Sequence, residues 1–283
     1  MDVKKLVEEW LYMSDFDISG KVAVITGAAG VLCSNIAEHL ALNGSRVVLL
    51  DIDIEGAKKV ADKINNEGGN AIAFKTNVLD KENLIKVKEK ILKQYDNIDI
   101  LINGAGGNKS EATTGNDYSF FELSEDSIKW VFNLNFLGTV LASQVFGEEM
   151  SKKGKGSIIN ISSMAAMRPL TRTIAYSGAK AAVSNFTQWL AVHLNQNYSE
   201  SIRVNAIAPG FLLTEQNRYL LIDEDSGEET ARGKKIKDNT PMNRYGKPDE
   251  LLGAIIWLSS EASSFVNGII LPIDGGFSAY SGV

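Results

Sequence analysis

Short apolar runs rich in β-branched residues alternate with longer helical segments along almost the whole chain, and this alternation restricts the fold more than any other feature. Strands joined through helices need crossover connections, which make neighbouring strands parallel and place helices on both faces of the sheet. The runs are continuously apolar, as expected for strands buried on both faces. We predict a doubly wound parallel α/β sheet with strands at Val22–Thr26, Arg46–Asp51, Ala71–Thr76, Ile98–Asn103, Ser157–Ser162, Arg203–Ala208 and Ile269–Pro272.

The chain shows no internal division into domains. No linker rich in Pro or Ser and no repeat of fixed period interrupts the 283 residues. We therefore expect a helical extension over residues 1–17 and one domain over residues 18–283. Between Thr214 and Pro241 the sequence becomes polar, with an acidic stretch at Asp223–Glu229. A long irregular segment of this kind is often a lid over a site, so we predict a lid at about 214–241, with a solvated surface loop as the alternative.

The charge balance and the few reactive side chains exclude several functions. With 35 acidic residues, 29 Lys and Arg and a net charge of −6, the chain is unsuited to a broad nucleic-acid surface. No apolar run approaches the length of a membrane span, so we expect a cytoplasmic protein that binds neither nucleic acid nor membrane. Cys33 has no second thiol to pair with, and His39 and His193 lie in helical patterns without partners nearby. We expect all three to be structural and no metal to be bound.

A glycine turn links the first strand to the first helix. Thr26 is followed by Gly27-Ala28-Ala29-Gly30, and a helical pattern begins at Val31 and Leu32. Glycines let the backbone approach a phosphate, and the free N–H groups of the helix attract its charge. We predict that Gly27, Gly30, Val31 and Leu32 hold the pyrophosphate of a dinucleotide in a Rossmann-type fold, a tight turn without ligand being the alternative.

An acidic residue closes the second strand. Asp51 lies about twenty residues after the glycines, where a carboxylate can accept hydrogen bonds from the adenosine ribose and repel a 2′-phosphate. Ile52 follows it, and no Arg or Lys stands beside it to reverse that preference. We predict NAD over NADP, the alternative role for Asp51 being a helix N-cap, which Asp53 could fill instead. Polar and small residues at the ends of the third and fourth strands complete the predicted cofactor site, namely Asn77, Val78, Asn103, Ala105 and Gly106.

Tyr176 and Lys180 lie four residues apart at the start of a predicted helix and therefore share one helical face. A free phenol has a pKa of about 10 and is a poor base at neutral pH unless a cation stabilises the phenolate. Lys180 can supply that charge. Tyr-x-x-x-Lys alone is a weak pattern, but here Ser162-Ser163 ends the preceding strand and Asn135 lies in the long helix before it.

In this order the glycine turn, Asn135, the serines and the Tyr-Lys pair resemble the short-chain dehydrogenase/reductase superfamily, from about Ile18 to the end of the chain. The resemblance implies a sheet of seven strands, a nicotinamide cofactor, and a homotetramer or homodimer. It implies that Tyr176 is the general acid/base, that Lys180 is its electrostatic partner and a ribose ligand, and that Ser163 binds the substrate oxygen. Asn135 would hold a water of the proton relay. The nicotinamide carboxamide would be bound by the segment containing Pro209, Gly210, Leu212 and Thr214.

The chain departs from the family pattern Gly-x-x-x-Gly-x-Gly, because Val31 and Cys33 occupy the two later glycine positions. A subgroup described as fructuronate reductase or D-mannonate oxidoreductase similarly reads Gly-Val-Leu there. This likeness implies a six-carbon sugar acid as substrate, whose carboxylate needs a cation. Besides Ser163, the candidate substrate ligands are Asn108, Lys109, Arg168 and Arg172.

Two other functions are compatible with the same residues. A polyol or gluconate-type dehydrogenase of the same superfamily would share every catalytic residue, and a substrate panel would separate it from a keto-hexonate reductase. A non-catalytic nucleotide-binding relative would be expected to lack the Tyr or the Lys. Both residues are present, which favours an enzyme that oxidises or reduces a CH–OH group with NAD(H).

Overall fold

The computed structural model describes residues 15–115, 118–215, 217–223 and 226–282. Seven parallel strands form one sheet in the order β3-β2-β1-β4-β5-β6-β7, which confirms the doubly wound α/β prediction. The strands begin and end within two residues of the predicted runs. They are β1 (Val22–Thr26), β2 (Arg46–Asp51), β3 (Asn70–Lys75), β4 (Ile100–Asn103), β5 (Gly156–Ile161), β6 (Ile202–Pro209) and β7 (Ile270–Ile273).

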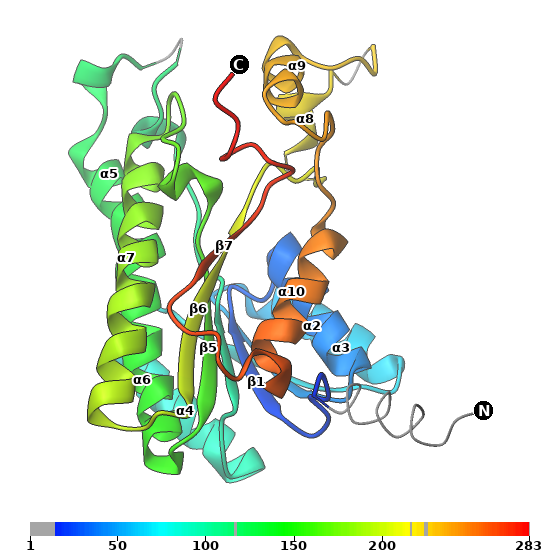
Figure 1. Cartoon of the computed structure of the whole chain (residues 1–283), viewed down its shortest axis with the longest axis vertical. Coiled ribbons are helices and arrows are strands. Elements are labelled where there is room, and N and C mark those ends of the chain that lie inside the picture. The colour runs from blue at the N-terminus through cyan, green and yellow to red at the C-terminus, as the bar shows by residue number, and fades with distance from the viewer. Residues whose placement is uncertain (1–14, 116–117, 216, 224–225, 283) are drawn as a thin grey trace.

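Helices cover both faces of the sheet (Figure 1). One face carries α2 (Val31–Leu42), α3 (Ile54–Asn66) and α10 (Leu252–Ser259), whose apolar residues form one core cluster with the strands. The other face carries α4 (Lys81–Tyr95), α6 (Gly138–Lys153) and α7 (Ile174–Asn197), which form a second cluster. Successive residues of β1 alternate between the two clusters, with Ala23 and Ile25 in the first and Val22 and Val24 in the second. This double burial explains why the strand sequences are apolar throughout.

Shorter helices lie in the connections. They are α5 (Glu125–Phe132), α8 (Arg218–Leu221) and α9 (Ala231–Asp238), the π-helix η3 (Asn133–Leu137) and the 3₁₀ turns Ser110–Ala112, Phe120–Glu122, Met164–Ala166, Pro248–Leu251 and Glu261–Ser263. The segment 214–241 was expected to be irregular, and that expectation is wrong for its described part, which contains α8 and α9. These helices could not be predicted from the sequence because they are short and polar. In α9 only Gly233 and Ile236 are buried.

The strand order creates a switch point. The chain adds β2 and β3 on one side of β1 and then crosses to add β4 on the other side. At such a point the loops that follow β1 and β4 diverge, and ligands bind in the crevice at the carboxyl ends of the strands. Most of the predicted N-terminal helix, residues 1–14, lies outside the described residues. Within the described ranges, no helix combines the length and the apolar character needed to cross a membrane.

Candidate active site

The main cavity lies at the carboxyl ends of the strands, at the switch point. Its volume is about 820 Å³, within the usual range for a small-molecule site. Most of the predicted cofactor residues line it: Gly27, Gly30, Val31, Leu32, Asp51, Ile52, Asn77, Val78, Ala105, Gly106, Tyr176, Pro209, Gly210, Leu212 and Thr214. The catalytic candidate Ser163 lines it as well. The structure therefore brings together residues from almost the whole length of the domain.

The glycine turn forms a close contact that only glycine can make. Gly27 has a φ of +70°, and a Cβ added to it would lie 2.7 Å from the Cα of Ala105 in the neighbouring loop. Thr26 holds that loop, because its Oγ1 accepts hydrogen bonds from the N–H groups of Gly104 (3.1 Å) and Ala105 (3.2 Å). Helix α2 begins directly after Gly30, which provides no side-chain cap. The first N–H groups of α2 are therefore available to an anion in the cavity.

Asp51 is fixed at the end of β2 by two backbone groups. Its Oδ2 accepts from Ala29 N (2.9 Å) and its Oδ1 accepts from Asp53 N (2.9 Å). The N-cap of α3 is Asp53, whose side chain accepts from Gly56 N at 3.0 Å. The alternative role of Asp51 as a helix cap is therefore taken by Asp53. Each Asp51 oxygen keeps a lone pair for a ligand, as ribose recognition requires.

Cys33 stands where the family pattern has a glycine, and the structure shows what accommodates it. A Cβ added to Gly104 would lie 2.1 Å from Cys33 Sγ, so the thiol fills space that Gly104 leaves empty. Burial raises the pKa of the Cys33 thiol to about 12, which keeps it neutral. The close contact between α2 and the loop after β4 is thus preserved, because the Cys33 thiol occupies the space beside Gly104.

Two of the cofactor candidates, Asn103 and Lys180, do not line the cavity. Asn103 lies at the end of β4. It is buried, and its Nδ2 donates to Ser143 Oγ (2.9 Å) and Asn160 Oδ1 (2.8 Å) within the sheet and its covering helix. These bonds connect β4, β5 and α6. The structure therefore gives Asn103 a supporting position behind the site and not a place on its wall.

Tyr176 and Lys180 approach each other at the start of α7. The Lys180 Nζ lies 5.6 Å from the centre of the Tyr176 ring and donates to the carbonyl oxygen of Ile161 at 2.7 Å. Burial lowers the pKa of Lys180 to about 8. Burial also raises the pKa of Tyr176 above its ordinary value, and a hydrogen bond with Ser163 offsets this only in part. The phenol is therefore neutral at physiological pH, the form that can give a proton to a carbonyl oxygen.

The two serines at the end of β5 have different environments. Ser162 lines the cavity, but its Oγ is engaged by α7, because it contacts Ser184 Oγ (2.7 Å) and donates to Lys180 O (3.3 Å). Ser163 contacts Tyr176 and accepts from Ala165 N at 3.1 Å. The choice of Ser163 from the family spacing agrees with this geometry.

Asn135 lies in the π-helix and is completely buried. Its Nδ2 donates to Gly107 O and Val131 O, both at 2.7 Å, and its Oδ1 accepts from Gly107 N at 3.3 Å. A Cβ added to Gly106 would lie 2.6 Å from Asn135 Oδ1 and 3.5 Å from Lys180 Nζ. Asn135, Lys180 and the loop after β4 therefore form one packed unit behind the cavity.

The candidate substrate ligands other than Ser163 do not line this cavity. Asn108 is exposed and donates to Thr113 Oγ1, and Lys109 Nζ lies 4.4 Å from the ring centre of Trp130, which does line it. Arg168 Nε donates to Ser278 O in the C-terminal tail at 3.1 Å. Arg172 is exposed and lines a separate cavity of about 590 Å³ beside the start of α7.

Sequence reasoning missed several residues of the cavity wall. Trp130 and Leu134 come from α5 and η3, and Asn217 from the segment after β6. Asn217 fixes that segment, since its Nδ2 donates to Leu212 O (2.7 Å) and its Oδ1 accepts from Thr214 N (2.8 Å). No local pattern in the sequence marks these positions.

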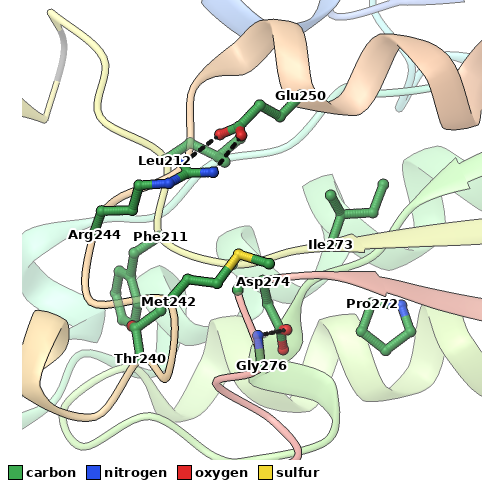
Figure 2. Close-up of a pocket in the computed structure, with 13 residues that line it drawn as sticks. Phe211, Leu212, Thr240, Met242, Arg244, Glu250, Pro272, Ile273, Asp274 and Gly276 are labelled. Atoms are coloured by element: carbon green, nitrogen blue, oxygen red, sulfur yellow. Dashed lines mark hydrogen bonds and ion pairs between the residues drawn. The ribbon is translucent and has the colours of Figure 1, made fainter.

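A smaller cavity of about 400 Å³, drawn in Figure 2, shares Gly210 and Leu212 with the main cavity. Its charged groups are already paired. Arg244 forms two hydrogen bonds with Glu250 (2.6 and 2.8 Å), which lower the pKa of that carboxyl to about 2. Asp274 accepts from the N–H groups of Gly276 and Ser278.

Within the described ranges, no group of His, Cys, Asp and Glu is arranged to hold a metal ion. The switch-point cavity is therefore the candidate active site.

A parallel sheet of this order, with a glycine turn and an acidic second strand at its switch point, is the architecture of a Rossmann-type nucleotide-binding oxidoreductase. The chain belongs to the short-chain dehydrogenase family, whose model matches residues 21–225. An uncharacterized oxidoreductase of Haemophilus influenzae is 52% identical over 281 residues, covering 95% of this chain and 97% of that protein. The chain is thus an oxidoreductase of the short-chain dehydrogenase family.

Two further comparisons bear on ligands. A crystal structure from Haemophilus influenzae, provisionally named a D-mannonate oxidoreductase and holding bound NAD, has a TM-score of 0.90 and 52% identity. The match covers 94% of this chain and 98% of that one. The 5-keto-D-gluconate 5-reductase of Escherichia coli is 34% identical over 261 residues, covering 92% of this chain and 96% of that protein.

Proposed function

We propose that this protein is an NAD(H)-dependent oxidoreductase that interconverts a keto-hexonate and an aldonate, of the fructuronate and mannonate type. The observation that carries this proposal is the 52% identity, over 94% of this chain, to the NAD-bound structure that bears the D-mannonate oxidoreductase name. That likeness supports both the cofactor and the substrate class of the proposal. The residues at the switch point supply the chemistry.

The cavity fits a dinucleotide. Gly27 lets the backbone come close, α2 offers uncapped N–H groups to a pyrophosphate, and Asp51 stands at the end of β2. The fixed carboxylate of Asp51 would accept hydrogen bonds from the ribose hydroxyls and repel a 2′-phosphate, so NAD is the cofactor and not NADP. When bound, the nicotinamide gives or takes the hydride.

The proton is moved by Tyr176. In the reductive direction its neutral hydroxyl protonates the ketone oxygen, and Ser163 donates a hydrogen bond to the same oxygen. Lys180 lies beside the ring, where its cation stabilises the phenolate that is left. Asn135 holds the loop at Gly106 and Gly107 against Lys180 and supports a water of the proton relay. In the oxidative direction the same groups remove the proton from the alcohol.

The substrate side of the site comprises the segment 214–241, which we propose to be a lid, and the polar groups at its edge. Asn108, Lys109 and Arg172 lie outside the lining of this cavity and are proposed, together with Ser163, to contact the sugar acid. Arg168 is a weaker candidate, because it is tied to the C-terminal tail. The proposal includes a homotetramer or homodimer in the cytoplasm, as is usual in the family.

A gluconate-type dehydrogenase is the second candidate, and the similarity to the 5-keto-D-gluconate 5-reductase favours it. A substrate panel decides between the two. Purified protein should be assayed by NADH absorbance with fructuronate, 5-keto-gluconate, fructose and dihydroxyacetone, and in reverse with mannonate, gluconate and xylitol. We expect the highest kcat/KM for fructuronate and mannonate, with NADH preferred to NADPH. Turnover of the neutral compounds alone would refute the sugar-acid assignment, and a preference for 5-keto-gluconate would establish the second candidate.

A further inference from the structure

The part of the cavity wall that leaves β6 is held by few backbone bonds. Leu213 N donates to Gly246 O (2.9 Å) and Gly246 N donates to Phe211 O (3.0 Å), which makes an isolated bridge between Leu212 and Gly246. No strand in the described part of the chain continues this pairing beyond the bridge. Leu212 and Thr214, which both line the cavity, therefore need another contact to keep their places.

Asn217 supplies this contact through both ends of its side-chain amide. Its Oδ1 accepts from Thr214 N (2.8 Å), and its Nδ2 donates to Leu212 O (2.7 Å). Its backbone N–H also donates to Thr214 O at 3.1 Å. An asparagine directly before a helix usually accepts a hydrogen bond from the first turn of that helix. Asn217 precedes α8 but forms no such cap, so its side chain serves the cavity wall and not the helix.

The position of Asn217 is fixed from the other side by α8 and α9. Thr230, the N-cap of α9, donates through its Oγ1 to Leu220 O (2.8 Å), and its backbone N–H donates to Leu221 O (3.0 Å). A Cβ added to Gly233 would lie 2.2 Å from Leu221 O, so the two helices are in close contact. Figure 1 shows them together beyond the carboxyl ends of β6 and β7. Asn217 thus joins the cavity wall to the proposed lid.

The bonds of Asn217 determine which groups of the wall are left for a ligand. They use Leu212 O and Thr214 N. The Leu212 N–H and the Thr214 hydroxyl have no hydrogen bond with any residue that the structure describes, although Leu212 is only 6% exposed. A buried N–H without a partner is rare and unfavourable, so a ligand atom that accepts a hydrogen bond is expected there. A carboxamide suits both groups, since its oxygen can accept from the N–H and its NH₂ can donate to the hydroxyl.

We propose that Asn217 is a positioning residue for the nicotinamide end of the cofactor. By holding Leu212 and Thr214, it keeps their free N–H and hydroxyl in the places where they bind the carboxamide. The adenosine end is held separately, because Gly27 follows β1 and Asp51 ends β2. Asn217 therefore orients the nicotinamide ring and takes no part in the proton transfer. This inference rests on the NAD(H) cofactor of the proposed function and adds a residue that the sequence did not indicate.

The test compares Asn217→Ala with Asn239→Ala. Asn239 lies in the same segment and its Nδ2 donates to Lys235 O at 2.8 Å, so its substitution removes a similar bond away from the cavity. Two affinities are measured by calorimetry: the Kd of NADH and the Kd of ADP-ribose, which is the cofactor without its nicotinamide. We expect Asn217→Ala to raise the Kd of NADH about 10-fold and the Kd of ADP-ribose less than about twofold. Asn239→Ala should leave both unchanged.

A double-mutant cycle tests whether Asn217 acts through Thr214. Thr214→Val removes the hydroxyl and keeps the shape of the side chain. Its effect on the Kd of NADH and that of Asn217→Ala should be non-additive, because the hydroxyl is in place only while Asn217 holds the segment. In turnover, Asn217→Ala should raise the KM for NADH and lower kcat, and the pH profile of kcat should keep its wild-type form because Tyr176 and Lys180 are unchanged.

The possible outcomes separate this inference from the proposed function. If Asn217→Ala weakens NADH and ADP-ribose equally, Asn217 supports the whole cavity and the positioning role is refuted. The role is also refuted if NADH binding does not change, or if Asn239→Ala causes an equal loss. If wild type binds neither NADH nor ADP-ribose, the proposed function fails, and the inference fails with it. Failure of the sugar-acid assignment alone does not affect the result, because both affinities are measured without a substrate.

Discussion

The two halves of the active site are built in different ways. The cofactor half, formed by the ends of β1, β2 and β4, is fixed by backbone contacts: Gly27 against Ala105, Asp51 against Ala29, and Thr26 against Gly104. The other part of the cavity wall is formed by side chains on connecting segments, such as Trp130 of α5 and Asn217 after β6. The first half tolerates few changes at any position, whereas the second can change its ligands without disturbing the sheet.

This difference has a functional consequence. All members of a dehydrogenase family must hold a similar cofactor. The cofactor site is therefore shaped by close contacts between backbone segments. Substrates vary, and the residues that select them are drawn from loops outside the core. The comparison can be tested by asking whether changes in one half leave the other unaffected.

Tyr176 should give the largest effect, because it faces both halves. Replacing Tyr176 by Phe removes the proton donor and keeps the ring beside Lys180. We expect kcat to fall about 10³-fold and the Kd of NADH to change less than about twofold. Steady-state kinetics and NADH fluorescence titration measure the two quantities. Tyr198→Phe, at an exposed position on the same helix's C-cap, is the control and should be silent. A parallel loss of NADH binding would show that the two halves are not separable.

The next effect isolates the close approach in the cofactor half. Gly27→Ala introduces a side chain at a φ of +70° and 2.7 Å from Ala105 Cα. Gly20→Ala has a similar φ of +73° but no atom within 4 Å, so it measures the backbone strain alone. We expect the free energy of unfolding to fall by about 2–4 kcal/mol for Gly27→Ala and about 1 kcal/mol for Gly20→Ala, by urea titration. Equal losses would mean that the contact with Ala105 has little importance.

The same contrast explains what could be predicted from sequence. The strands, the glycine turn and Asp51 follow from local patterns, since each depends on backbone conformation or spacing along the chain. The roles of Tyr176, Lys180 and Ser163 follow from the resemblance to the family. The places of Trp130 and Asn217 on the cavity wall depend on where loops from separate parts of the chain meet, which no local period records. Asn103 was assigned to the cofactor because it ends a strand, but its amide turns into the sheet to join Ser143 and Asn160.

The contact between Cys33 and Gly104 gives a smaller and more specific test of the cofactor half. Gly104→Ala places a methyl group where the Cys33 thiol lies, and should cost about 1–3 kcal/mol of stability. Cys33→Gly alone restores the residue of the family pattern and leaves a small void. In the double variant the two changes compensate, so we expect a favourable coupling energy in urea unfolding. Additive losses would indicate that α2 and β4 do not share this space.

Lys180 links the two halves, and its burial should be visible in the pH dependence of stability. Its pKa is about 8 in the folded protein, against 10.5 for a free lysine. Between these values the unfolded chain binds a proton that the folded chain does not, so Lys180 makes the free energy of unfolding increase with pH across this window. Lys180→Met lacks this contribution. The stability of wild type relative to Lys180→Met should therefore rise by about 1–2 kcal/mol between pH 8 and 9.5, measured by urea titration of both proteins. A difference that is constant with pH would mean that Lys180 keeps an ordinary pKa, and that the cation beside Tyr176 is well solvated and has a weaker influence on the phenolate.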